Sequence, residues 1–236
     1  PEGTMNINNG AVYSGASVVV LRFPDTSADV DKMKLSNIAD LSADGDNVGS
    51  GTWVNFNSGP VSWNLSSGNG TKTVYVKLKN LAGNESEQIY SDSIILDTNT
   101  PSSTIISPAD SVEINSLTSI NGTVTEVGSG FTNKNQVTVA LINESGYYWN
   151  GVMFDLPEVW LEVTTLTGEL PNYTWTYTAL PNFVNGDYLI KVKATDDAGN
   201  AEITGAGHTF VFDNTPPVIS SLSSSSHPNQ SLWIGA

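Results

Sequence analysis

The sequence predicts an all-β chain made of two antiparallel β-sandwiches in tandem. No window of the 236 residues shows a clear 3.6-residue period, whereas short apolar runs between Gly, Asn, Asp and Ser clusters recur throughout. Ser, Thr, Asn and Gly are abundant while Lys and Arg total nine, a composition that suits strands and turns better than helices. The second half of the chain also repeats a phrase from the first half.

The repeated phrase has a constant spacing. "KLKNLAGNE" at 77–85 corresponds to "KATDDAGNA" at 193–201, and Gly199 lies 116 positions after Gly83. The same offset relates the Asp residue that ends the following apolar run in each half. A period this long indicates two copies of one domain and not the unit of a solenoid.

Seven strands are expected in each copy. In the first copy the strand-like runs are 4–7, 17–23, 32–36, 53–56, 62–65, 72–80 and 91–97. In the second copy they are 103–107, 119–126, 136–143, 159–164, 173–178, 188–196 and 208–213. Seven short strands in about 100 residues is the number expected of an immunoglobulin-like or fibronectin-type sandwich. We place the two domains at 1–99 and 100–217, with 218–236 as a linker that starts a further repeat or as a docking tail.

The run 188–196 shows how such a strand would pack. Its residues alternate, so Tyr188, Ile190 and Val192 share one face and are expected to enter the core, while Lys191 and Lys193 face outward. Tyr188 follows a turn and is expected to be a tyrosine-corner residue, whose hydroxyl bonds back to the preceding loop.

Charge and composition exclude several classes of function. The net charge of −15 would repel nucleic-acid phosphates and anionic lipid headgroups, and it favours cations as partners. The absence of cysteine excludes disulfides, thiolate metal sites and a Cys nucleophile. The longest apolar run, at 16–21, is too short to span a bilayer. We therefore expect no nucleic-acid partner and no membrane insertion.

The segment "NGDYLIKVKATDDAGN" at 185–200, followed by "FDNTPP" at 212–217, resembles the Ig-like repeats of large bacterial and archaeal cell-surface proteins, adhesins and surface-layer proteins. "NGTKTVYVKLKNLAGNES" at 69–86 is similar to a companion repeat type, and "SSSHPNQSLW" at 224–233 resembles the opening of a further repeat. The resemblance implies an extracellular structural or adhesive role in a surface layer, a filament or an adhesin stalk. The implied partners are neighbouring repeats, copies of the chain or other surface proteins.

Calcium is the candidate cofactor, because hard cations prefer oxygen ligands and many carboxylates lie near turns. The resemblance adds that some adhesin repeats bind Ca²⁺ near their domain junctions. The candidate ligands are Asp196, Asp197, Asn200 and Asp213 in the second copy and Asp97 and Asp92 in the first. The alternative is that Ala-Gly-Asn supplies only a hairpin turn. Asn80 and Leu81 replace the two acids in the first copy, which argues against a metal site in that turn.

A second candidate calcium site is "DLSADGDN" at 40–47, with Asp40, Asp44 and Asp46 as ligands. Its start matches the first half of an EF-hand loop, in which alternating oxygens point inward and Gly makes a sharp bend. The match ends there, because Gly51 occupies the place of the bidentate Glu. The alternative is a solvated acidic loop.

The aromatic stretch at 146–161 is the candidate ligand-binding surface. Tyr and Trp faces pack on the apolar faces of sugar rings, so Tyr147, Tyr148, Trp149 and Trp160 would form a glycan-binding or protein-binding platform. This gives the alternative function, an accessory binding module. Equally, the aromatic residues could cover one end of the sandwich.

No catalytic motif is apparent. The two histidines, His208 and His227, lie outside any nucleophile motif, and we predict that the chain is not an enzyme. Asn-x-Ser/Thr sequons allow glycosylation of a surface protein without establishing it. They are at Asn64, Asn69, Asn84, Asn121, Asn143, Asn172 and Asn229.

Overall fold

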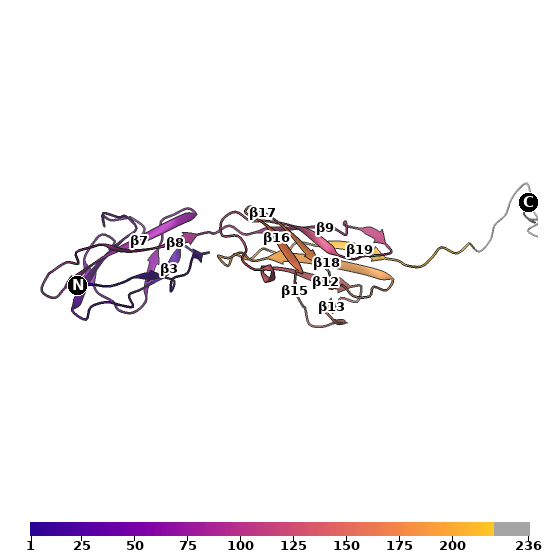
Figure 1. Ribbon diagram of the computed structural model, residues 1–236, viewed down its shortest axis with the longest axis horizontal. Helices are drawn as coiled ribbons and strands as arrows, with labels where there is room; N and C mark the ends of the chain where they lie inside the picture. The colour runs from indigo at the N-terminus through magenta and orange to yellow at the C-terminus, as the bar shows by residue number, and fades with distance from the viewer. Residues whose placement is uncertain (220–236) are drawn as a thin grey trace, which may run out of the picture.

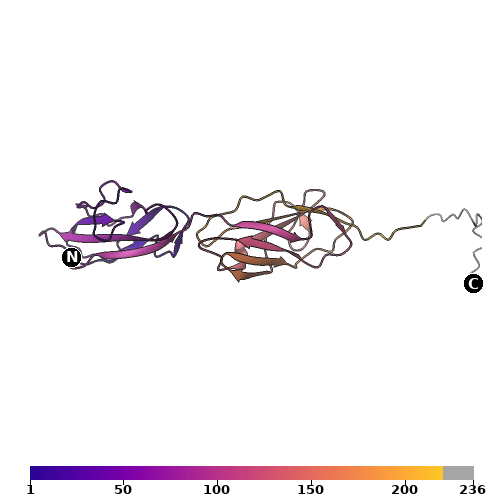
Figure 2. The ribbon, with the colours of Figure 1, turned by 90° about the horizontal axis from the view of Figure 1, so that it is seen from above.

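The computed structural model describes residues 1–219. Within that range the regular structure consists of strands β1–β19 and one short 3-10 turn, η1 (Lys134–Gln136). The predicted all-β class is therefore confirmed. No helix in the described range is long and apolar enough to cross a membrane. Two groups of strands follow one another along the long axis in two perpendicular views (Figure 1 and Figure 2).

Strands β1–β8 form two sheets, which we call the N-terminal unit. The three-stranded sheet has the order β1 (Asn6–Ile7), β3 (Val18–Arg22), β6 (Val61–Asn64). The five-stranded sheet has the order β2 (Tyr13–Ser14), β8 (Tyr90–Leu96), β7 (Gly70–Asn80), β4 (Val30–Ser36), β5 (Val54–Asn55). The pairs are antiparallel except β2 with β8.

Strands β9–β19 form two further sheets, which we call the C-terminal unit. The first has the order β16 (Thr165–Glu169), β17 (Asn172–Tyr177), β11 (Ile120–Thr125), β9 (Ser102–Ser107). The second has the order β10 (Val112–Ile114), β19 (His208–Phe212), β18 (Gly186–Ala194), β12 (Val137–Asn143), β13 (Tyr148–Trp149), β14 (Phe154–Asp155). Strand β15 (Leu161–Glu162) lies outside this order and pairs with β12. The predicted limits 1–99 and 100–217 remain a prediction.

Each unit encloses its own hydrophobic core. In the N-terminal unit the inward side chains include Ile7, Leu21 and Val74, none of which is exposed. In the C-terminal unit Trp175 is fully buried, and its indole Nε1 donates to the Thr123 carbonyl over 3.2 Å. Burying large apolar side chains is the main source of stability for a sandwich, so each unit has what it needs to hold together.

Strand β18 packs as its alternation predicts. Tyr188, Ile190 and Val192 are buried, whereas Lys191 and Lys193 are partly exposed. The Tyr188 hydroxyl donates to the Val184 carbonyl over 3.0 Å, which is the tyrosine-corner hydrogen bond. Both the strand's inner face and its corner residue are thus confirmed.

The repeated phrase forms the same turn in both units. Gly83 N donates to the Asn80 carbonyl over 2.9 Å, and Gly199 N donates to the Asp196 carbonyl over 3.1 Å. Both glycines have positive φ, 87° and 88°. The backbone N–H that follows each glycine then donates to the side-chain oxygen of the turn's first residue. The turn is therefore architectural in both copies, and only the second copy adds a carboxylate to it.

Candidate metal centre

Three buried carboxylates meet where the two units join. Asp97 follows β8 of the N-terminal unit, Glu126 follows β11, and Asp196 begins the turn after β18. Their exposed fractions are 1%, 1% and 3%. One carboxylate oxygen of each lies within 4.8 Å of the other two, and within residues 1–219 no other group of three potential metal ligands is this close.

The backbone fixes where these residues lie. Asp97 N donates to the Ser14 carbonyl over 2.9 Å, which continues the pairing of β2 with β8 past the end of the strand. Glu126 N donates to the Pro171 carbonyl over 3.0 Å. The carboxylates of Asp97 and Glu126 therefore sit at the ends of rigid strands and not on long loops.

The Asp97 carboxylate joins the two units directly. Oδ1 accepts hydrogen bonds from Asn99 N over 3.1 Å and from Asn69 Nδ2 over 3.4 Å. Oδ2 accepts from Ser129 N of the C-terminal unit over 2.7 Å. Oδ1 thus binds residues of the N-terminal unit and the connection that follows it, and Oδ2 binds the C-terminal unit.

Asn200 links Asp97 of the N-terminal unit to Asp196 of the C-terminal unit. Its Nδ2 donates to the Asp97 carbonyl over 2.8 Å and to Asp196 Oδ2 over 2.9 Å. Asn200 N also donates to Asp196 Oδ1 over 2.8 Å. Asn200 therefore orients Asp196 toward the junction and ties the turn to the N-terminal unit.

Glu126 carries the oxygen that the protein leaves without a partner. Its Oε2 accepts from Gly130 N over 2.6 Å, whereas Oε1 is buried and has no hydrogen-bond partner. Burial raises the pKa of Glu126, and the charges of Asp97 and Asp196 add to this effect against the opposing Gly130 hydrogen bond. A buried, unpaired carboxylate oxygen is costly unless a proton or a cation accompanies it.

Two glycines allow this close approach. Gly128 has φ +147°, and a Cβ there would lie 2.3 Å from the Asp97 carboxyl carbon. A Cβ on Gly15 would lie 2.8 Å from both the Ala198 carbonyl oxygen and Asn200 Oδ1. A larger residue at Gly128 would displace the Asp97 carboxylate, and one at Gly15 would displace the turn that carries Asp196 and Asn200.

The donor set suits a hard divalent cation. Three carboxylates offer only oxygen atoms, and Ca²⁺ takes six to eight such ligands from carboxylates, carbonyls and water. The orphaned Glu126 Oε1 adds an independent sign that the cluster is incomplete without a cation. Asp97, Glu126 and Asp196 are the residues that would hold it.

The structure brings together only part of the predicted ligand set. Asp97, Asp196 and Asn200 meet at the junction. Asp197 turns away, and its Oδ1 accepts from Thr132 N, Thr132 Oγ1 and Gln136 Nε2. The Asp92 carboxylate accepts from Ile7 N over 2.7 Å and so ties β8 to β1.

Asp213 lies at the other end of the C-terminal unit, where it repeats part of the Asp97 arrangement. Its Oδ1 accepts from Thr215 N over 2.8 Å and from Asn185 Nδ2 over 2.9 Å. Asn99 N and Asn69 Nδ2 play these parts for Asp97. The two aspartates are therefore equivalent in the repeat, but only Asp97 has the two further carboxylates beside it among the described residues.

The loop at 40–47 does not gather its carboxylates. Asp40 Oδ1 caps Ser42 N over 2.8 Å, and Asp44 accepts from three backbone amides, those of Asn37, Asp46 and Asn47. Burial alone would raise the pKa of Asp44, but these hydrogen bonds and one with the Ser50 side chain outweigh it and lower the pKa. Asp46 Oδ2 accepts from Asn37 Nδ2. Amides of the loop and of Asn37 thus engage these carboxylates, which supports the interpretation of a solvated acidic loop.

The aromatic stretch does not form a continuous platform. Trp149 is 8% exposed and belongs to the core, where its Nε1 donates to the Ala179 carbonyl over 2.8 Å. The expectation that Trp149 stacks on a ligand is corrected for this reason. Lys193 Nζ lies 4.0 Å from the Trp160 ring centroid, Tyr148 is half-buried, and Tyr147 is exposed.

The sequon asparagines lie mainly at the surface. Asn64, Asn69, Asn84 and Asn172 are exposed, Asn121 and Asn143 are partly buried, and Asn229 lies outside the described residues. Their glycosylation stays a prediction.

Glu126 is the one member of the carboxylate group that the sequence did not suggest. Strand pairing sets Gly122 opposite Trp175 and Val19 opposite Trp63, so Glu126 corresponds to Phe23 in the N-terminal unit. Glu126 lies outside the repeated phrase and has no acidic counterpart in the first copy, so the repeat does not point to it. The one available signal is its place at a strand end before "GSG".

Comparison with known proteins finds a family match for part of the chain. Residues 170–233 match the family model of a bacterial Ig-like domain (group 3), as the resemblance predicted. No curated protein matches the sequence. Among solved structures, dimeric latent PorU from Porphyromonas gingivalis is 11% identical with a TM-score of 0.30, over 89% of this chain and 20% of that one. The chain thus spans a fifth of that structure's length, and so distant a likeness says nothing about function.

Proposed function

Because residues 170–233 match a bacterial Ig-like domain, we propose that the chain is a structural module of a bacterial surface protein, a spacer in a surface layer, a filament or an adhesin stalk, in which Ca²⁺ fixes the junction between the two units. Bacterial Ig-like domains are typically non-enzymatic and commonly occur in extracellular proteins. The observation that carries the proposal is the buried group of three carboxylates with one orphaned oxygen.

The linker supports a rigid connection. Five residues, 97–101, separate the end of β8 from the start of β9. Thr98 N donates to Asn69 Oδ1 over 3.2 Å, and Asn99 Nδ2 donates to the Val127 carbonyl over 2.6 Å. Pro101 is buried and restricts φ at the end of the linker. A connection this short, bonded to both units, suits a spacer that transmits force.

Repulsion among the three carboxylates favours the binding of a cation. Two unit charges 4 Å apart in a partly buried setting interact by about 4 kcal/mol, so three ionised carboxylates this close would drive the units apart. A bound Ca²⁺ would supply the compensating charge. Asp97 from one unit and Glu126 and Asp196 from the other would then hold the junction closed.

Calcium titration of EDTA-treated protein, followed by calorimetry, tests the proposal. We expect one strongly bound Ca²⁺ per chain and at least about tenfold weaker binding by Asp97→Asn, because that variant removes a charged ligand. Asp213→Asn is the matched control, since it makes the same change at the equivalent position and should bind as the parent does. The proposal fails if the parent binds no Ca²⁺ or if both variants bind equally well.

A further inference from the structure

Four lysines crowd one face of the N-terminal unit. Strand pairing sets Lys32 opposite Lys79 and Lys34 opposite Lys77 on neighbouring strands β4 and β7. Met33 and Leu78, which alternate with them, are buried, so the four lysines face outward. We call these four residues the lysine face.

This arrangement works against the stability of the sheet. Like charges directly opposite one another on paired strands are destabilising. In the C-terminal unit the equivalent strands avoid the conflict, because Lys191 lies opposite Ala140 and Lys193 opposite Thr138. The sandwich therefore does not require paired lysines, and in a chain of net charge −15 their concentration calls for a functional reason.

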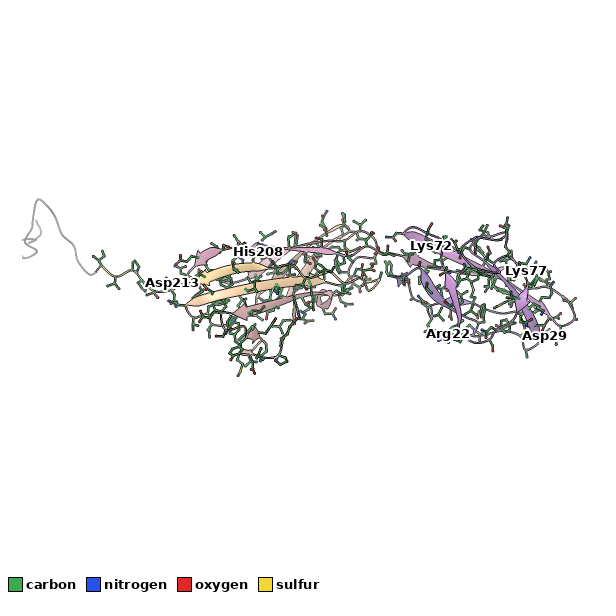
Figure 3. All side chains as sticks on the ribbon, turned by 180° about the vertical axis from the view of Figure 1, so that it is seen from behind. Arg22, Asp29, Lys72, Lys77, His208 and Asp213 are labelled. Atoms are coloured by element: carbon green, nitrogen blue, oxygen red, sulfur yellow. The ribbon has the colours of Figure 1, made fainter. Side chains whose placement is uncertain are left out.

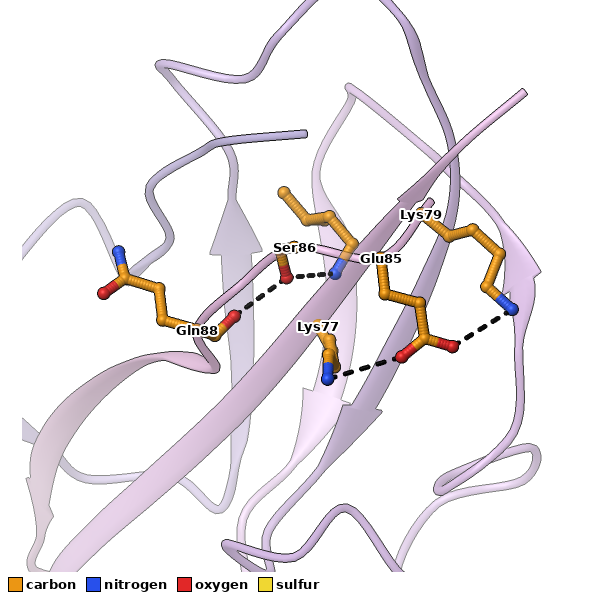
Figure 4. Close-up of polar contacts among 6 residues, drawn as sticks. Lys77, Lys79, Glu85, Ser86 and Gln88 are labelled. Atoms are coloured by element: carbon orange, nitrogen blue, oxygen red, sulfur yellow. Dashed lines mark hydrogen bonds and ion pairs between the residues drawn. The ribbon is translucent and has the colours of Figure 1, made fainter. Parts of the chain in front are cut away.

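The unit compensates this charge only in part. Glu85 lies 3.3 Å from both Lys77 and Lys79, and Figure 4 shows its carboxylate between the two ammonium groups. Asp31 lies 3.8 Å from Lys32. The Trp53 ring centroid lies 4.1 Å from Lys79 Nζ. Four ammonium groups thus meet two carboxylates and one indole, so the face stays positive.

A complementary row of acids lies on the C-terminal unit. Val211 of β19 pairs with Glu113 of β10 on one side and with Asp187 of β18 on the other. Both acids are exposed, and Val211 is 39% exposed between them. Residues 98–219 contain thirteen acidic and three basic residues, a net charge of −10. We call Glu113, Val211 and Asp187 the acidic row.

The two surfaces lie at opposite ends of the chain. Figure 3 places Lys77 of the lysine face on the N-terminal unit and Asp213, which follows the β19 strand of the acidic row, at the far end of the C-terminal unit. One chain therefore cannot bring its own two surfaces together. A second copy can.

We propose that the lysine face of one copy docks on the acidic row of a second copy. Carboxylates at the contact would offset the cross-strand repulsion that the isolated unit carries. A pair in which both contacts form at once would close as a self-complementary dimer, whereas a staggered arrangement would extend into a lateral assembly. The proposal goes beyond the calcium junction and does not depend on it.

Sedimentation velocity in EDTA tests the contact while keeping calcium out of the result. We expect concentration-dependent self-association at about 0.1 M salt and its loss at about 1 M, where the screening length falls from about 10 to 3 Å. The double variant Lys34→Glu/Lys77→Glu should associate at least about tenfold more weakly. Lys134→Glu, a charge reversal on the C-terminal unit outside both surfaces, should leave association as it is.

Mixing reversed charges provides the decisive result. The Lys34→Glu/Lys77→Glu chain and a Glu113→Lys/Asp187→Lys chain should each self-associate poorly, and together they should form a complex. The proposal is overturned if the parent stays monomeric at about 0.1 M salt, or if the mixture forms no complex. It is also overturned if the lysine face instead retains an acidic polysaccharide, with binding lost in the double lysine variant, while copies stay apart.

Discussion

Removing Ca²⁺ with EDTA is expected to lower the free energy of unfolding by about 2.7 kcal/mol, relative to protein in a hundredfold excess of Ca²⁺ over Kd. The expectation follows from a site that exists only when Asp97 of one unit meets Glu126 and Asp196 of the other. Because the unfolded chain does not hold these carboxylates together, binding adds directly to stability. Thermal and urea unfolding with Ca²⁺ and with EDTA measure the difference.

Glu126→Gln tests whether Ca²⁺ stabilises the protein by binding at Glu126. Burial, with the charges of Asp97 and Asp196, raises the pKa of Glu126 from its ordinary value of 4.5. In metal-free protein the contribution of Glu126 to the free energy of unfolding is therefore most favourable below pH 4.5. That contribution is lost as pH rises through the pKa of Glu126 in the folded state. Glu126→Gln should remove this loss in EDTA and also abolish most of the gain from Ca²⁺. Equal Ca²⁺ stabilisation of parent and variant would contradict the assignment of Glu126.

Gly122→Val is expected to destabilise the C-terminal unit by about 3 kcal/mol. A Cβ at Gly122 would lie 1.9 Å from the Thr104 carbonyl oxygen of β9 and 2.7 Å from the Trp175 ring. In the N-terminal unit the equivalent position is Val19 on β3. Strand β1 pairs with β3 only at Leu21 and Arg22 and so does not pair with β3 at Val19. The lack of space thus comes from β9, which continues along β11 past Gly122.

Scanning calorimetry of the variant measures this effect. We expect the unfolding transition of the C-terminal unit to move to lower temperature, while that of the N-terminal unit, which has a separate core, stays near its original position. Gly205→Val is the matched control, because a Cβ at Gly205 would meet nothing within 4 Å. A single transition that shifts as a whole would show that the two cores do not unfold independently.

The fold could be predicted largely because its signals are local. Alternation placed Tyr188, Ile190 and Val192 in the core, and the turn residues of the repeated phrase marked the same hairpin in both units. Seven strands are expected in each unit, whereas within residues 1–219 the structure has eight in the first and eleven in the second; β2 and β10 are among those that the sequence does not predict. They pair in parallel with the last strand of each unit and are too short to show alternation.

The candidate site could be predicted only in part, because it depends on contacts that are distant in sequence. The sequence suggested Asp97 and Asp196, which belong to the repeated phrase, but gave no reason to join them to Glu126. The burial of Trp149 could not be predicted for the same reason, because its indole donates to the carbonyl of Ala179, which is distant in sequence. Charge pattern alone likewise did not reveal that Lys32 and Lys34 face Lys79 and Lys77 across a strand pair.

Residual dipolar couplings of the two units test the calcium junction most directly. If Asp97, Glu126 and Asp196 hold one ion, a single alignment tensor should describe both units in Ca²⁺. In EDTA, and in Asp97→Asn with Ca²⁺, the two units should require different tensors because the junction becomes a hinge. Asp213→Asn should behave as the parent does. Tensors that are the same with and without Ca²⁺, whether the units move together or separately, would contradict a junction held by calcium.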